Sequence, residues 1–253
     1  MTGIKLIITD LDNTIVRRDN SISDYTCSVL RDAKRKGISI AFATSRSESA
    51  SARFIRAIEP DMGIYNGGAL VKRGSQVLSQ VFIPEVEAKR IIGLCLEEKI
   101  ISMTTTDGYF SSEPIIDNFS TYIDYADGHH IDFRSNVDLS HVYKITVYSD
   151  RRDALLGIAD SNDTVALQNF VGESWYQFRP ISATKESAIQ LLGYSPIEIA
   201  AFGDDSNDIG MLKYCGTSVA MGNAIPECKA ISGYVCGDCK DDGVAHWIIE
   251  HLL

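Results

Sequence analysis

Three clusters of polar residues in this chain each follow a short apolar run. They are Asp10–Thr14 (DLDNT), Thr44–Arg46 (TSR) and Gly203–Asp208 (GDDSND). If the apolar runs are parallel strands, their carboxyl ends meet at one edge of a sheet, where open α/β proteins place their binding sites. We therefore expect the three clusters to converge on a single site.

The aspartates of these clusters are typical of a site for a divalent cation. Asp10 and Asp12 are two residues apart at a strand end, so we expect them to face the same side. Asp204 and Asp208 bring further negative charge to the same edge. Neighbouring carboxylates repel one another unless a cation or a shared proton intervenes, and Mg²⁺ prefers oxygen ligands of this kind. We predict a Mg²⁺ site, although Asp208 alone would fit a helix cap equally well.

A phosphoryl group held at this edge would need donors for its oxygens. Thr44 opens a strand-to-helix turn, where free backbone N–H groups can bind an anion. Lys185 could supply a fixed positive charge, although a lysine near the start of a helix is usually only solvated. Together these residue types favour phosphoryl chemistry.

The elements that must position these residues follow from the hydrophobic pattern. Both ends of the chain alternate β-branched apolar runs with helical patterns. The predicted strands are Ile4–Thr9, Ile38–Thr44, Gly63–Tyr65, Ile197–Phe202, Ser218–Met221 and Tyr234–Cys236. The predicted helices are Ser23–Lys36, Ser47–Ile58, Thr184–Leu192, Asp208–Tyr214, Ile225–Ile231 and Gly243–Leu253. This alternation predicts an α/β fold with a doubly wound, Rossmann-like parallel sheet.

The middle of the chain has a different pattern. After a hairpin over Ala69–Ile83, the pattern predicts antiparallel strands with flanking helices. The predicted helices are Pro84–Lys99 and Asp150–Asp160, and the predicted strands are Ile100–Thr106, Val142–Tyr148, Val165–Phe170 and Trp175–Phe178. Because the alternating pattern resumes afterwards, we predict an α+β domain over residues 84–178, inserted into a core formed by residues 1–83 and 179–253.

The composition limits the partners of the protein. The chain has 253 residues and a formal net charge of -10, from 34 acidic and 24 basic residues. Such a chain lacks the basic surface of a nucleic-acid binder and is repelled by an anionic membrane. No apolar run approaches the ~18 residues of a membrane span, and the first residues do not fit a secretory signal. We expect a cytoplasmic protein, monomeric or weakly homo-oligomeric, that binds neither nucleic acid nor membrane.

Other potential metal ligands are sparse. The six cysteines include one CxxC pair, Cys236 and Cys239, whereas a structural zinc site needs four ligands. His129 and His130 are adjacent, so on a strand or loop their side chains point apart. We predict reduced thiols, and no metal site at either place.

In their order along the chain, the motifs resemble those of the haloacid dehalogenase-like phosphatases, and most closely the Cof-type hydrolases with a large inserted cap. Asp10–Thr14 matches the DxDxT motif of that family, and Gly203–Asp208 matches its GDxxND motif. Thr44 and Lys185 match its second and third motifs, and Asn66-Gly67 resembles the NG element after the third strand. The similarity covers nearly the whole chain.

The sequence departs from the family pattern at three places. Ser45 stands where the second motif usually has glycine, Gly68 where alanine is usual, and Glu186 where glycine is common. None of these replaces a group that carries charge in the chemistry.

The resemblance implies a Mg²⁺-dependent phosphatase that works through an aspartyl-phosphate. Asp10 is the implied nucleophile. Asp12 is the implied acid and base, which requires acidic neighbours to raise its pKa. Mg²⁺ would be held by the side chains of Asp10 and Asp204 and by the backbone carbonyl of Asp12. Asp208 would either ligate the ion directly or support its ligands.

The resemblance also implies contacts with the substrate, a small phosphate ester such as a sugar phosphate. Thr44, Lys185 and Asn207 would bind the phosphoryl oxygens. Arg46, Asn66 and Gly67 are further predicted substrate contacts. The insert would act as a cap over the site, and its polar segment Thr106–Asn118 is a candidate for substrate selection.

Several other functions fit parts of the pattern. A phosphomutase of the same family would return the phosphoryl group to a sugar, and a catalytically inactive sensor would only bind a phosphorylated metabolite. A dehalogenase has no use for Asp12, and a response-regulator receiver is much shorter and lacks the insert. We expect a phosphatase, and the phosphomutase and the sensor remain the alternatives.

Overall fold

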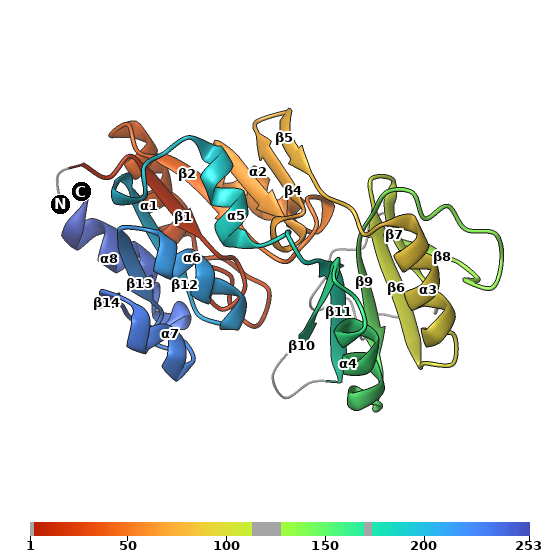
Figure 1. Ribbon diagram of the computed structural model, residues 1–253. Coiled ribbons are helices and arrows are strands. Elements are labelled where there is room, and N and C mark those ends of the chain that lie inside the picture. Colours follow the sequence, from red (N-terminus) through yellow and green to blue (C-terminus); the bar gives the residue numbers. More distant parts are fainter. Residues whose placement is uncertain (1–2, 113–127, 170–173) are drawn as a thin grey trace. The chain divides into compact units, whose positions relative to one another are not determined.

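This computed structural model describes residues 3–112, 128–169 and 174–253. The chain divides into two compact units, which we call the core unit (Met1–Ser79 with Thr184–Leu253) and the insert unit (Gln80–Ala183; Figure 1). The insert unit begins a few residues before the predicted boundary, since the Gln80 side-chain amide donates a hydrogen bond to the Tyr143 hydroxyl. It also ends later, because its last strand continues to Pro180.

The core unit contains an eight-stranded sheet in the order β14-β13-β12-β1-β2-β3-β4-β5. Its strands are β1 (Leu6–Thr9), β2 (Ser39–Ala43), β3 (Met62–Tyr65), β4 (Leu70–Arg73), β5 (Gln76–Gln80), β12 (Ile199–Gly203), β13 (Thr217–Ala220) and β14 (Tyr234–Val235). The strands from β14 to β3 pair in parallel, and β4 turns back antiparallel to β3. The predicted parallel sheet is confirmed, and β1 lies near its middle, between β12 and β2.

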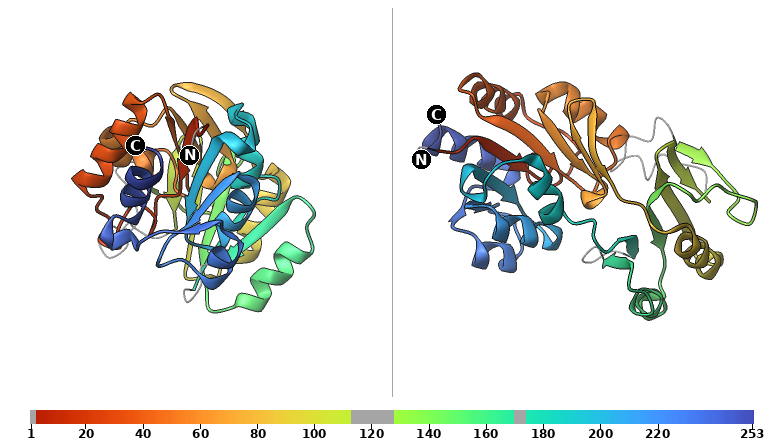
Figure 2. Two further views of the ribbon diagram at one scale, coloured as in Figure 1. Left: turned by 90° about the vertical axis from the view of Figure 1, so that its left-hand side faces the viewer. Right: turned by 45° about the horizontal axis from the view of Figure 1, so that its top comes forward.

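Helices cover both faces of this sheet (Figure 2). They are α1 (Asp24–Arg35), α2 (Ala52–Ile58), α5 (Lys185–Ile189), α6 (Ile209–Tyr214), α7 (Pro226–Ile231) and α8 (Gly243–His251). Helix α1 packs against α2 and α8, whereas α6 packs against α5 and α7. The helix predicted from Ser47 begins later, because Ser49–Ser51 forms a 3₁₀ turn. Of the helices in the described ranges, none is both long and apolar enough to cross a membrane.

The start of α1 shows how the loop after β1 is tied to the C-terminal helix. The Ser23 hydroxyl oxygen caps α1 by accepting a hydrogen bond from the Thr26 N–H at 3.0 Å. The same hydroxyl donates to Oδ1 of Asp242 at 2.6 Å, just before α8 begins. The Thr26 hydroxyl and Nη2 of Arg17 also donate to Asp242 Oδ1. One carboxylate therefore holds three points of the segment that follows β1.

The insert unit contains a six-stranded sheet in the order β10-β11-β9-β6-β7-β8. Its elements are α3 (Glu85–Cys95), β6 (Ile100–Thr105), β7 (Gly108–Ser111), β8 (Gly128–His130), β9 (Val142–Tyr148), α4 (Arg152–Asp160), β10 (Val165–Asn169) and β11 (Trp175–Pro180). Apolar residues of α3, α4 and the sheet form one core. The polar segment Thr106–Asn118, predicted to be an irregular loop, forms a strand over part of its length. Gly108–Ser111 forms a strand paired with β6, and residues 113–118 lie outside the described ranges.

Gly68 in the connection from β3 to β4 is required for close packing. Its φ is +114°, and a Cβ atom there would lie 2.4 Å from the carbonyl oxygen of Thr184. We expect Gly68→Ala to lower the free energy of unfolding by about 2–4 kcal/mol, because strain and a backbone clash add together. Urea unfolding followed by circular dichroism measures this loss.

Gly74→Ala is the matched control for this substitution. Gly74 also has a positive φ, of +55°, but a Cβ atom there would meet nothing within 4 Å. Its replacement isolates the conformational penalty, about 1 kcal/mol. Equal losses in the two variants would contradict the proposed clash.

Candidate active site

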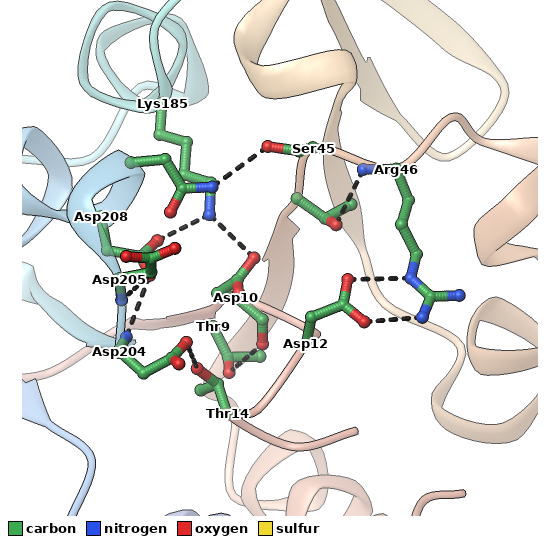
Figure 3. Close-up of polar contacts among 12 residues, drawn as sticks. Thr9, Asp10, Asp12, Thr14, Ser45, Arg46, Lys185, Asp204, Asp205 and Asp208 are labelled. Atoms are coloured by element: carbon green, nitrogen blue, oxygen red, sulfur yellow. Dashed lines mark hydrogen bonds and ion pairs between the residues drawn. The ribbon is translucent and has the colours of Figure 1, made fainter. Parts of the chain in front are cut away.

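Asp10 and Lys185 form a buried ion pair at the carboxyl end of β1 (Figure 3). The Asp10 N–H donates to the carbonyl oxygen of Phe202 at 3.0 Å, which fixes Asp10 between β1 and β12. Lys185 is the first residue of α5, after the helix cap Thr184. Its Nζ donates to Oδ1 of Asp10 at 2.8 Å, and both side chains are buried. The third-motif lysine and the first-motif aspartate therefore meet as expected for one site.

Asp208 holds the other side of the lysine. Lys185 Nζ also donates to Asp208 Oδ1 at 2.6 Å. Asp208 Oδ2 accepts hydrogen bonds from the backbone N–H groups of Asp204 and Asp205 at 3.0 and 3.2 Å. Both oxygens of this fully buried carboxylate are thus engaged. This geometry supports a role in orienting Lys185 and the loop after β12, and direct ligation of a metal by Asp208 stays a prediction.

Three carboxylates of the site lie close enough together to hold one cation. Ligand oxygens of Asp10, Asp204 and Asp208 all lie within 4.8 Å of one another, and this is the group of metal-ligating side chains found in the described ranges. The Thr14 hydroxyl donates to Asp204 Oδ1 at 3.1 Å and fixes its orientation. Buried carboxylate oxygens are the donors that Mg²⁺ favours, so these residues fit the expected ion.

The electrostatics of the site also favour a cation. Burial raises the pKa of Asp10 to about 7, against the opposing effect of Lys185 and with help from the charges of Asp208 and Asp12. Burial, with the charges of Asp10 and Asp208, raises the pKa of Asp204 to about 8. Burial acts to lower the pKa of Lys185, but the two carboxylates that it contacts raise it above its usual value. A divalent ion would favour the charged carboxylates and reverse their shifts.

The Asp12 side chain points away from this group and toward Arg46 (Figure 3). Its Oδ2 and Oδ1 accept hydrogen bonds from Nε and Nη2 of Arg46 at 2.9 and 2.6 Å. Nη2 also donates to Oδ1 of Asn20 at 2.9 Å. Arg46, predicted as a substrate contact, is therefore already engaged by two side chains.

This geometry corrects the expected direction of the Asp12 side chain. It does not face the same side as Asp10, because β1 ends at Thr9 and the chain then turns. The N–H groups of residues 14–16 all donate to the carbonyl oxygen of Leu11, which ends the alternation of a strand. The Asp12 carboxyl group forms an ion pair with the guanidinium of Arg46, while its charge still acts on the neighbouring Asp10. To act as the predicted acid and base, Asp12 would have to exchange these hydrogen bonds.

The loop after β2 supplies the predicted phosphate-binding threonine. Thr44 is fully buried, and its hydroxyl oxygen accepts a hydrogen bond from the Arg46 N–H at 3.1 Å. Ser45, where the family usually has glycine, accepts a hydrogen bond from Nδ2 of Asn207 at 3.1 Å. Oδ1 of Asn207 is buried without a partner. Ser45 thus joins the ends of β2 and β12, a contact that the sequence reasoning missed.

The Asn66-Gly67 element holds the backbone of this loop by hydrogen bonds. The Asn66 N–H donates to the carbonyl oxygen of Arg46, and the Gly67 N–H donates to that of Thr44, at 2.8 and 2.9 Å. These two predicted substrate contacts therefore use their backbone donors on the protein itself. Oδ1 of Asn66 is buried without a partner, so a contact of this side chain with substrate stays a prediction.

The cysteines and the histidine pair were considered above as potential metal ligands. All six cysteines are free thiols. His129 and His130 lie on β8 of the insert unit. Neither the CxxC pair nor the histidine pair belongs to a metal-binding group in the described ranges.

The chain is similar to one known family over almost its whole length. A family model described as haloacid dehalogenase-like hydrolase matches residues 7–248. The HMP-PP phosphatase of Klebsiella pneumoniae is 24% identical, with 98% of this chain and 96% of that protein covered. The 5-amino-6-(5-phospho-D-ribitylamino)uracil phosphatase YitU of Bacillus subtilis is 25% identical, with 98% and 97% covered.

The fold also has close structural relatives. The HAD subclass IIB sugar phosphatase BT4131 matches with a TM-score of 0.84 and 23% identity, and 97% of this chain and 98% of that chain are covered. At this level of identity the likeness shows the fold. It includes both the parallel core sheet and the inserted α+β unit.

Proposed function

Because this chain belongs to the haloacid dehalogenase-like hydrolases and, with its phosphatase relatives, is a phosphoric monoester hydrolase, we propose that it is a Mg²⁺-dependent phosphatase of small phosphorylated metabolites. The observation that carries this proposal is the buried pair of Asp10 and Lys185 beside Asp204 and Asp208. A carboxylate nucleophile, a fixed cation and a place for a divalent ion lie together there. These are the parts that phosphoryl transfer requires.

In the first step, an Oδ of Asp10 attacks the phosphorus and forms an aspartyl-phosphate as the bond to the leaving oxygen breaks. Asp12 gives its proton to that leaving oxygen. Lys185 stabilises charge on the phosphoryl oxygens, and the Thr44 hydroxyl and the Asn207 amide are the proposed neutral donors. In the second step, Asp12 takes a proton from water, which displaces phosphate from Asp10.

Asp10 and Asp204 are the proposed side-chain ligands of the cation, with the Asp12 carbonyl as a third protein ligand. When bound, Mg²⁺ supplies positive charge that stabilises the phosphoryl oxygens and keeps the carboxylates ionised. Without such charge, Asp10 has a pKa of about 7 and is partly protonated near neutral pH. Nucleophilic attack requires its ionised form.

The substrate is proposed to be a small phosphate ester, such as a sugar phosphate. One relative is named for HMP-PP, another for a phosphorylated ribitylaminouracil, and a structural neighbour is a sugar phosphatase. We propose that the insert unit acts as the cap and selects the leaving group. The cytoplasm, where such metabolites are found, is the proposed location.

Phosphate release from purified protein tests the proposed function. We expect release from para-nitrophenyl phosphate and from at least one member of a panel of sugar phosphates, nucleotides and phosphorylated cofactors. A chelator should lower the rate by at least about 100-fold, because it removes the charge that keeps Asp10 ionised and stabilises the transition state. Added Mg²⁺ should restore the rate.

Three outcomes would contradict this proposal in different ways. Full activity in excess chelator would exclude the dependence on a divalent cation. Conversion of a sugar phosphate to its isomer without free phosphate would identify a mutase. Binding of a metabolite without turnover, with Mg²⁺ present, would identify a sensor.

A further inference from the structure

The loop that follows the nucleophile contains a backbone conformation that needs support. Asn13 lies between Asp12 and Thr14 and has a φ of +54°, in the left-handed region. Asparagine tolerates this region better than most residues, but such a conformation persists only where its surroundings fix it. The Asn13 N–H donates to the carbonyl oxygen of Val16 at 2.8 Å, which fixes one side of the residue.

A side chain from a distant part of the chain fixes the other side. Nδ2 of Asn223 donates to the carbonyl oxygen of Asn13 at 2.8 Å. Oδ1 of Asn223 accepts a hydrogen bond from the N–H of Cys239, also at 2.8 Å. Asn223 follows β13, which is separated from β1 by the single strand β12. One side-chain amide thus joins the loop that follows Asp10 to the segment before α8.

The turn that contains Asn223 is itself closely packed. The Gly222 N–H donates to the carbonyl oxygen of Gly237 at 3.1 Å. A Cβ atom on Gly222 would lie 2.4 Å from Oδ1 and 2.9 Å from the backbone nitrogen of Asp238. The segment that includes Cys239 is held again at Asp242, which accepts hydrogen bonds from three side chains after β1. The backbone on both sides of the Asn223 hydrogen bonds is therefore fixed, so that Asn223 can restrain the position of Asn13.

We propose that Asn223 is a positioning residue for the phosphatase reaction. The carbonyl that it binds belongs to the peptide group between Asn13 and Thr14. The orientation of that group sets the direction of Thr14, whose hydroxyl reaches Asp204, and limits the position of Asp12 on the other side. The catalytic consequence rests on the proposed function, whereas the hold on the loop does not.

Two variants of Asn223 separate this role from a structural one. Asn223→Asp keeps an acceptor for the Cys239 N–H but places a carboxylate oxygen against the Asn13 carbonyl. Asn223→Ala removes both hydrogen bonds. The side chain is exposed, so neither change opens a cavity in the core. Both variants should lower kcat by about 10- to 100-fold, because a displaced acid or ligand loses its alignment. KM should change by less than about two-fold, since Asn223 contacts none of the proposed phosphate donors.

Hydrogen exchange without substrate tests the hold on the loop independently of activity. Amides in a peptide that covers residues 11–17 should exchange faster in both variants than in the wild type. Wild-type kcat and exchange in Asn223→Asp, with losses only in Asn223→Ala, would overturn the proposal in favour of the Cys239 contact alone. If the wild type releases no phosphate, the proposed function fails, and the exchange measurement still decides whether Asn223 fixes Asn13.

Discussion

Asp10→Asn is expected to lower kcat by about 10⁵-fold, the scale seen when a catalytic nucleophile is removed. The asparagine amide is a poor nucleophile, so no covalent intermediate can form on it. Its Oδ1 can still accept a hydrogen bond from Lys185, which also keeps its contact with Asp208. The loss should therefore reflect chemistry and not the collapse of the site.

The fold of this variant should be at least as stable as that of the wild type. Burial raises the pKa of Asp10 to about 7, which means that the folded protein penalises its charged form. A neutral amide avoids that penalty. Thermal unfolding in chelator should give a midpoint equal to or above that of the wild type, and a marked fall would show that activity was lost through misfolding.

Asp12→Asn is the control that separates the two aspartates. It keeps the nucleophile but removes the proposed acid and base. With para-nitrophenyl phosphate, whose leaving group needs little protonation, labelled phosphate should accumulate on this variant because water attack is slowed. Asp10→Asn should carry no label under the same conditions. Label on Asp10→Asn would place the nucleophile elsewhere.

The sequence predicts the parts of this site that follow directly from strand ends. Asp10 and Asp204 each follow a short apolar strand, and parallel pairing of β1 with β12 brings their positions together. The prediction that Lys185 belongs to the site depended on the family motif, since nothing in its local sequence distinguishes it from a solvated lysine. Its burial against two carboxylates is a property of the assembled fold.

The direction of Asp12 could not be predicted from the period of a strand. That period holds only while the strand continues, and here the chain turns after Thr9. The Ser45–Asn207 contact and the Asn223–Asn13 contact join segments that are far apart in sequence, so no local pattern signals them. The place of Asn223 does carry a signal, because it lies two residues after the predicted strand Ser218–Met221 and binding sites form at strand ends.

Two strands of the insert unit, β7 and β8, were not predicted from the sequence for a related reason. β7 is four residues long and pairs with β6 through a turn at Thr106-Asp107, so its apolar pattern is too short to be distinct. β8 has three residues and includes the histidine pair. Short strands of this kind take their structure from their neighbours, not from their own sequence.

Asp204→Asn is expected to abolish the response to Mg²⁺ while stabilising the metal-free protein. The side chain is one of three buried carboxylates whose oxygens lie within 4.8 Å of one another. The asparagine keeps a similar shape and an oxygen for the Thr14 hydroxyl, but it removes one of the repelling charges. In chelator, its thermal midpoint should exceed that of the wild type by about 3 °C or more, which corresponds to ~1 kcal/mol in a protein of this size.

The stabilities of the wild type and of Asp204→Asn should also depend differently on pH. The folded protein raises the pKa of Asp204 from 3.8 to about 8. The folded state therefore binds this proton more tightly than the unfolded state, and stability falls as the pH rises from about 4 to about 8. In chelator, the wild type should lose stability over this range more steeply than Asp204→Asn. Asp10 keeps its own raised pKa, so the slope in the variant should be reduced and not abolished.

Mg²⁺ should reverse the order of the two proteins. A cation that binds only the folded state raises the free energy of unfolding by an amount that grows with the logarithm of its concentration relative to its dissociation constant. The wild type should therefore gain stability with added Mg²⁺, and Asp204→Asn should not. Asp205→Asn is the matched control, because Asp205 caps the next turn through the Ser206 N–H and lies outside the carboxylate group. It should keep both the Mg²⁺ response and the activity. A lower thermal midpoint of Asp204→Asn than of the wild type in chelator would show that the carboxylates do not repel one another in the folded protein. An undiminished Mg²⁺ shift in that variant would show that Asp204 does not bind the cation.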